Sequence, residues 1–148
     1  MHPDLGPMVG SWRLSTVEAT FSDTGERAAT FGPDPNGRMM LSPCGRITFL
    51  IMKSNRSSAP NDAARATLCN ETIAWSGTVR PASPGEFVTK VEVSLFPEEI
   101  GTEKPRRFRL DGDRFIITVT ERTSRVTHGR LAVSELIWRR EYPAADVD

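Results

Sequence analysis

The sequence predicts a mostly antiparallel, all-β domain. Three observations indicate this fold class: apolar and polar residues alternate over short segments, turn-forming residues separate these segments, and only one stretch has the composition of a helix. About nine such segments at this spacing are typical of a β-sandwich or a β-barrel. The alternation alone does not choose between the two.

Four strands are expected in the first half of the chain. Turn residues at Ser22-Asp23-Thr24-Gly25 end the first of them, and the loop at residues 32–37 carries two prolines that fix the backbone torsion φ. In the fourth segment apolar residues occupy both faces, which predicts a strand that is buried on both sides. The expected strands are Trp12–Phe21, Glu26–Phe31, Arg38–Leu41 and Arg46–Lys53.

The stretch Pro60–Thr72 is predicted to be the one helix. Proline suits a first helical turn, the asparagine and aspartate that follow suit the positive end of the helix dipole, and the alanines are strong helix formers. Ala64, Thr67 and Leu68 are expected to form its buried stripe.

The second half of the chain is again predicted to be β. The Asp111-Gly112 dipeptide between two alternating segments is a strong hairpin signal. Residues 97–105 and 122–129 are expected to be loops, and residues 143–148 a loose tail. The expected strands are Ile73–Arg80, Phe87–Phe96, Arg106–Leu110, Arg114–Glu121 and Arg130–Tyr142.

Length and composition predict one domain over residues 1–148, with its core at about residues 10–142. Lys plus Arg and Asp plus Glu each number 19, so the bulk charge favours neither nucleic acid nor an anionic membrane as a partner. No apolar stretch approaches the roughly 20 residues of a membrane span, and the first residues do not resemble a signal peptide. With two cysteines far apart, we expect a cytoplasmic protein with free thiols.

Four blocks of sequence, in order, resemble the bacterial lipocalin-like domain family, a group of calycin-type barrels. The first is Gly10-Ser11-Trp12-Arg13-Leu14, which is similar to the Gly-x-Trp opening of lipocalins. The second joins residues 31–37 to 41–46, the third joins 92–97 and 101–102 to 107–113, and the fourth is Leu136-Ile137-Trp138-Arg139-Arg140. The resemblance implies an antiparallel up-and-down barrel of about eight strands, with one short α-helix before the middle strands.

The resemblance also implies how one end of the barrel is closed. In lipocalins the opening tryptophan closes that end and an arginine of the last strand covers it. By position, Trp12 matches the tryptophan, and Arg139 or Arg140 matches the arginine. A guanidinium stacks well on an indole face, so we expect a structural lid. Relatives often carry histidine at the positions of Thr89 and Lys90, and no role of those histidines carries over to this chain.

Motifs for catalysis or metal binding are sparse. The two histidines, His2 and His128, fall in a terminus and in a polar loop, where they are expected to be solvated. Cys44 and Cys69 are expected to be packed thiols. No nucleotide-binding or nucleophile motif is found, so the sequence predicts neither a metal nor a cofactor.

Three charged residues are candidates for a donor inside the barrel: Lys90, Arg109 and Glu135. Lys90 shares a strand face with Glu92, and that face looks either outward or inward, where the pair would have perturbed pKa values. Glu135 sits in an apolar row of the last strand. It is expected there either as a structural ion pair or an exposed end, or as a polar anchor or general acid in a pocket. Arg109 is either solvated or able to bind a carboxylate or enolate.

In a barrel the inward positions form both the core and the lining of any pocket. The sequence leaves two functions of such a pocket open. The first is binding of a small hydrophobic molecule, and the second is cofactor-free isomerisation or cyclisation of a polyketide- or terpenoid-like molecule in the same pocket. A third possibility is an interaction module without a ligand, and the chain is expected to be a monomer or a homodimer. The expected ligand contacts are Met40, Phe49, Ile51, Trp75, Val91, Val93, Phe108, Ile117 and Glu135.

Overall fold

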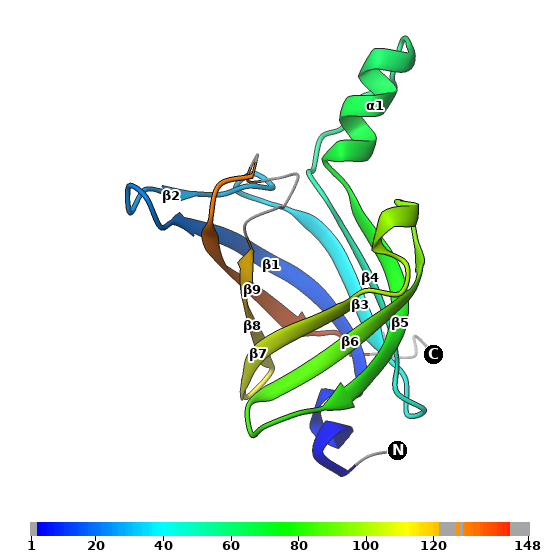
Figure 1. Cartoon of the computed structure of the whole chain (residues 1–148), viewed down its shortest axis with the longest axis vertical. Coiled ribbons are helices and arrows are strands. Elements are labelled where there is room, and N and C mark those ends of the chain that lie inside the picture. Colours follow the sequence, from blue (N-terminus) through cyan, green and yellow to red (C-terminus); the bar gives the residue numbers. More distant parts are fainter. Residues whose placement is uncertain (1–2, 122–126, 128, 143–148) are drawn as a thin grey trace, which may run out of the picture.

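The computed structural model describes residues 3–121, 127 and 129–142. They form one antiparallel sheet that closes on itself, because β1 pairs with β9 as well as with β3 (Figure 1). The closed ring of β1 and β3–β9 is an eight-stranded barrel, which confirms the predicted fold class. The strands are β1 (Gly10–Phe21), β2 (Arg27–Ala28), β3 (Asn36–Leu41), β4 (Arg46–Met52), β5 (Ile73–Pro81), β6 (Glu86–Ser94), β7 (Glu103–Asp111), β8 (Arg114–Glu121) and β9 (Ala132–Arg140).

Two predicted elements differ most from the structure in their bounds. The predicted strand Glu26–Phe31 shrinks to β2, which pairs only with the end of β1 and stays outside the ring. Strand β7 begins at Glu103, inside the predicted loop at residues 97–105. Pro105 is the reason for this error, because a proline has no backbone N–H and is therefore uncommon inside strands. It still fits a strand position that needs no donor, and here it lies opposite Val88 of β6.

Alternate residues of the ring strands point into the barrel interior. In β4, Ile47, Phe49 and Ile51 are buried, whereas Leu50 on the other face is 40% exposed. The prediction that this strand is buried on both sides is therefore wrong. Only the inner face of a closed barrel meets the core, and no second layer covers β4 in the described part of the chain.

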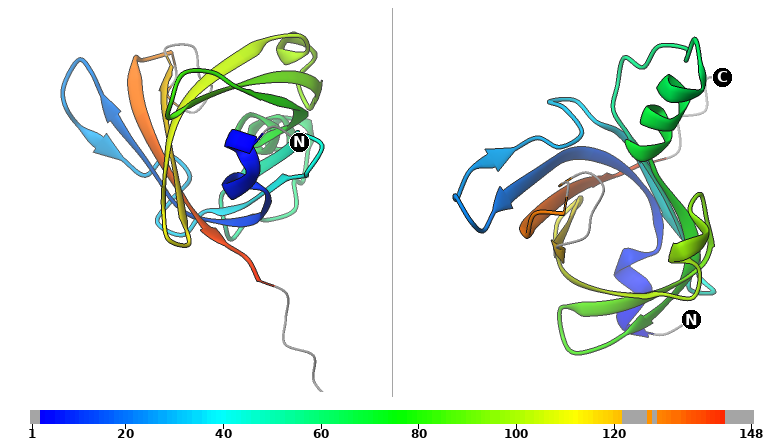
Figure 2. Two further views of the ribbon diagram at one scale, coloured as in Figure 1. Left: turned by 90° about the horizontal axis from the view of Figure 1, so that it is seen from below. Right: turned by 45° about the horizontal axis from the view of Figure 1, so that its top comes forward.

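One end of the barrel is closed by the short 3-10 helix Pro3–Met8, which lies across the ring (Figure 2). Its residues Leu5 and Met8 are buried against the core. The indole Nε1 of Trp12 donates to the carbonyl of Met8 at 3.0 Å.

The guanidinium of Arg140 covers the indole of Trp12, with its central carbon 4.2 Å from the ring centroid. The same guanidinium donates to the carbonyls of Val9 and Pro7 at 2.9 and 2.7 Å. It therefore ties the last strand to the segment before β1. Of the two arginines considered from the sequence, Arg140 holds this place, whereas Arg139 is exposed on the outer face.

The α-helix α1 (Asp62–Asn70) lies between β4 and β5 and projects from the opposite end of the barrel (Figure 1). Asn61 caps it, its side-chain oxygen accepting from the backbone N–H of Ala64 at 2.9 Å. The predicted buried stripe is wrong: no residue of α1 is buried, Ala64 and Leu68 are half-buried, and Thr67 is exposed. The helix stands clear of the core, so its apolar side chains have little to pack on.

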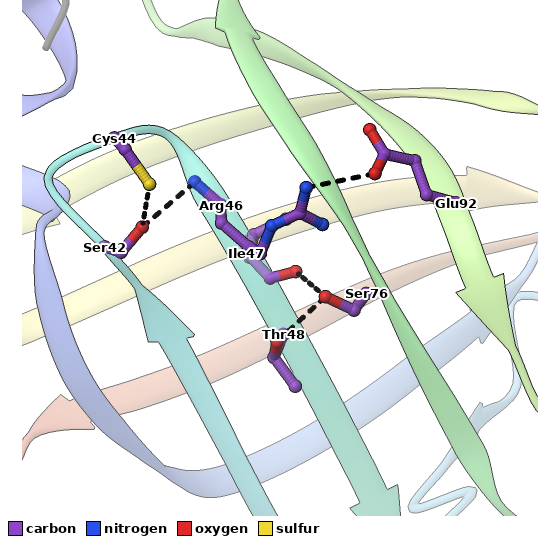
Figure 3. Close-up of polar contacts among 7 residues, drawn as sticks. All are labelled: Ser42, Cys44, Arg46, Ile47, Thr48, Ser76 and Glu92. Atoms are coloured by element: carbon purple, nitrogen blue, oxygen red, sulfur yellow. Dashed lines mark hydrogen bonds and ion pairs between the residues drawn. The ribbon is translucent and has the colours of Figure 1, made fainter.

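A β-bulge interrupts the pairing of β5 and β6. Ser76 lies opposite Val93 but Gly77 lies opposite Val91, which leaves Glu92 as the extra residue. On the outer face beside the bulge, the Ser76 hydroxyl donates to the Ile47 carbonyl at 3.1 Å and lies 3.0 Å from the Thr48 hydroxyl (Figure 3). Glu92 there accepts from Arg46 of β4 at 3.0 Å.

Candidate functional site

A cavity of about 710 Å³ occupies the barrel interior and reaches the connections at the end opposite Trp12. Side chains from six of the eight ring strands and from the segment before β3 supply its apolar wall. Phe49 of β4 and Trp75 of β5 stack in this wall, with ring centroids 5.1 Å apart and planes 10° apart. The apolar lining residues are Val17, Phe31, Ile47, Phe49, Ile73, Trp75, Phe87, Ile117, Val119, Ala132 and Leu136.

The charged lining residues gather at the rim, where β6 passes through the short 3-10 helix Pro97–Glu99 into β7. Lys104 and Glu99 form an ion pair there, with 3.4 Å between nitrogen and oxygen. Their side chains are only 21% and 17% exposed, so water screens this pair less than the other ion pairs of the barrel surface. The remaining charged lining residues are Glu98, Glu103 and Arg106.

Two lining hydroxyls stand out because they are buried without a hydrogen bond to any described residue: those of Thr30 and Thr89. Thr89 projects from β6 and its side chain is fully buried, whereas Thr30 is half-buried in the segment before β3. Beyond its place in the alternation with Phe87 and Val91, nothing in the sequence marks Thr89 as a lining residue. Its neighbour Lys90 lies on the opposite, exposed face.

The predicted ligand contacts divide into three groups. One group lines the cavity, a second is buried or half-buried in the barrel core without lining it, and a third lies on the outer face. The placement of the third group inside the barrel is therefore wrong. Phe49, Trp75 and Ile117 line the cavity. Ile51, Val91 and Phe108 lie in the barrel core without lining it. Met40, Val93 and Glu135 lie on the outer face.

The bulge explains the misplaced Val93. A strict alternation from Phe87 would point Val93 inward, but the extra residue Glu92 reverses the two faces beyond it, and Val93 is 63% exposed. Met40 is misplaced for a simpler reason. It adjoins Met39 in β3, and Met39 points inward at 2% exposure while Met40 is 52% exposed.

The three predicted donor candidates are likewise not in the cavity. Lys90, Arg109 and Glu135 are all exposed, so of the two alternatives left open by the sequence the outward placement holds for each of them. Glu135 shares an outward row of β9 with Val133, whereas Ala132, Ser134 and Leu136 belong to the inward row that lines the cavity. The apolar residues beside Glu135 thus belong to the barrel surface.

Neither histidine falls within the described residues, and among those residues no group of acidic, cysteine or histidine side chains could hold a metal ion. Cys44 is exposed and Cys69 half-buried, and both are free thiols. The Ser42 hydroxyl lies 3.0 Å from the sulfur of Cys44 (Figure 3). This hydrogen bond, followed by that from the backbone N–H of Arg46, holds the pKa of the Cys44 thiol below its ordinary value. No helix in the described part of the chain is long and apolar enough to cross a membrane.

Comparison with known proteins gives one family match. A family model described as a lipocalin-like domain matches residues 9–141. No curated protein matches the chain. Among solved structures, a de novo designed fluorescence-activating β-barrel is similar over 95% of this chain and 100% of its own, at 15% identity and a TM-score of 0.49. A redesigned β-barrel is similar over 96% and 98%, at 15% identity and a TM-score of 0.46. The four resembling sequence blocks all lie within the family match, so the resemblance is confirmed.

Proposed function

Since the chain belongs to the lipocalin-like domain family, we propose that it binds a small hydrophobic molecule inside its barrel. The observation that carries this proposal is the interior cavity of about 710 Å³ with its apolar wall. Ligand pockets in proteins span about 300–1,000 Å³ and combine a hydrophobic lining with a few polar groups. This cavity has that size and that composition, so release of water from the wall would drive binding.

An isomerase or cyclase would need an acid or a base within hydrogen-bond reach of its substrate. The three candidates for that role lie on the outer face, and the charged lining residues of the described chain gather at the rim. Binding without catalysis is therefore the function that the cavity supports best. A cytoplasmic location, supported by the two free thiols, and a monomeric or homodimeric state complete the proposal.

The proposal is tested with N-phenyl-1-naphthylamine, an apolar dye that becomes fluorescent out of water. The purified protein should bind it, and Val119→Trp should weaken binding by about tenfold or more, because a bulky ring in the wall removes space for the dye. Titration of the dye fluorescence gives both dissociation constants.

The matched control is Val133→Trp, the same substitution on the outer face. Val133 is 40% exposed in β9 and lies opposite Thr120, the residue next to Val119 in β8. It should leave dye binding unchanged. Equal affinities for the two variants, or no binding to the unmodified protein, would contradict the proposal.

A further inference from the structure

The hydroxyl of Thr89 is a polar group that the barrel itself does not satisfy. The side chain is fully buried, its Oγ1 has no hydrogen-bond partner among the described residues, and the residue lines the cavity. Proteins rarely leave a buried hydroxyl unpaired, because loss of its hydrogen bonds to water is then uncompensated. A bound molecule is the natural source of the missing partner.

The surroundings of Thr89 are apolar on its own strand. Its inward neighbours Phe87 and Val91 are buried, and Val79 lies opposite it on β5. On β7, the other neighbour of β6, Lys104 lies opposite Thr89, but its ammonium is already paired with Glu99 at the rim. Arg106, which also lines the cavity, lies opposite Phe87 and donates to the Pro105 carbonyl at 3.0 Å. A charged ligand group beside Thr89 would have to be desolvated, whereas a neutral oxygen costs much less to bury.

From this we propose that the ligand is an oxygenated hydrophobic molecule, whose neutral carbonyl or hydroxyl oxygen binds the Thr89 hydroxyl. The proposal rests on the proposed binding function and narrows its ligand class. A carbonyl oxygen would accept from Thr89, and a ligand hydroxyl would accept from it or donate to it. A pure hydrocarbon would leave the Thr89 hydroxyl unpaired and would bind less tightly.

The test uses fluorene and 9-fluorenone, which share a ring system and differ by one ketone oxygen. Each is titrated as a competitor of N-phenyl-1-naphthylamine against the unmodified protein and against Thr89→Val, which replaces the hydroxyl by a methyl group of similar size. The preference for the ketone over the hydrocarbon should fall about fivefold in Thr89→Val, the value of one neutral hydrogen bond. The ketone-to-hydrocarbon affinity ratio of Thr89→Val is divided by the same ratio of the unmodified protein, so the different solubilities of the two probes cancel.

Two further variants keep the result interpretable. Thr89→Ser retains a hydroxyl and should retain the ketone preference. Thr78→Val makes the same change as Thr89→Val on the outward face of the adjacent strand β5 and should leave the preference unchanged. Thr89→Val should also unfold at the same temperature as the unmodified protein or a higher one, since it removes an unpaired buried polar group.

The possible results separate the inference from the function. If fluorene binds but the ketone preference is equal in all variants, the role of Thr89 is wrong while the binding function stands. If 9-fluorenecarboxylate binds more tightly than 9-fluorenone, the ligand class is anionic and the proposal is overturned. If neither probe nor the dye binds, the proposed function itself fails.

Discussion

Cys44 shows how one neighbouring side chain sets the chemistry of a surface residue. It is exposed in the turn between β3 and β4, and the Ser42 hydroxyl next to its sulfur stabilises the thiolate. Because the pKa of this thiol is lowered, the thiolate fraction, and with it the alkylation rate, should rise at a lower pH than for an ordinary cysteine.

Substituting Ser42→Ala removes the largest cause of that shift, so the alkylation profile of Cys44 should move to higher pH. The measurement is the rate of reaction with iodoacetamide against pH, in a Cys69→Ser background that leaves one thiol. Far above both midpoints Ser42→Ala should react at the same rate or faster, because a thiolate of higher pKa is the stronger nucleophile. A profile that Ser42→Ala does not move would show that the hydrogen bond does not stabilise the thiolate.

At the scale of residues, the sequence predicts which side chains share a strand face but not which face is the inner one. Phe49, Trp75 and Ile117 line the cavity, but alternation alone does not single them out, because Leu50 beside Phe49 and Ile116 beside Ile117 are equally apolar. Met40 could not be separated from its equally apolar neighbour Met39 without the register of β3. A hydroxyl such as that of Thr89 gives no sequence signal for being unpaired.

At the scale of elements, Gly77 determines whether β5 and β6 can pair beside the bulge. A Cβ atom on this residue would lie 1.9 Å from the carbonyl oxygen of Lys90, which is backbone and cannot rotate away. Gly77→Ala should therefore destabilise the fold by about 3 kcal/mol or more, as measured by denaturant unfolding.

The control for this substitution is Gly6→Ala. A Cβ atom there meets nothing within 4 Å, so the free energy of unfolding should change by less than about 0.5 kcal/mol. A small effect of Gly77→Ala would mean that the strands separate easily at the bulge.

Bulges of this kind are the reason that the sequence could locate β6 and still misplace its last residues, since one extra residue leaves the composition of a strand unchanged.

At the scale of the whole molecule, Arg140 joins the two ends of the ring. It covers the indole of Trp12 and bonds two carbonyls that precede β1. Gly10 makes room for it, because a Cβ atom there would lie 2.9 Å from its guanidinium. Arg140→Met should lower the free energy of unfolding by about 2 kcal/mol through the loss of the stacking and both hydrogen bonds.

Arg139→Met is the control for the closed end, since Arg139 is exposed on the outer face, and it should change stability by less than about 0.5 kcal/mol. Thermal unfolding of the two variants side by side makes the comparison. Equal melting temperatures would show that Arg140 does not stabilise the closed end of the barrel.

The closure itself is the part of the fold that alternation could not predict. Alternating segments are compatible with two packed sheets as well as with a ring, and the choice came from the four resembling sequence blocks. The decisive contact, the pairing of β1 with β9, joins residues at opposite ends of the chain, and no local pattern reports it.

That pairing has a consequence for how the protein is made. The register runs from Trp12 opposite Arg140 to Phe21 opposite Ala132, so β1 can pair with β9 only after all the other strands of the barrel have been synthesised. Contacts of such high sequence separation slow folding, because the entropy of a long loop is lost before the contact forms. Without that pairing, β1 and β9 would each present an unpaired strand edge, and such edges favour aggregation.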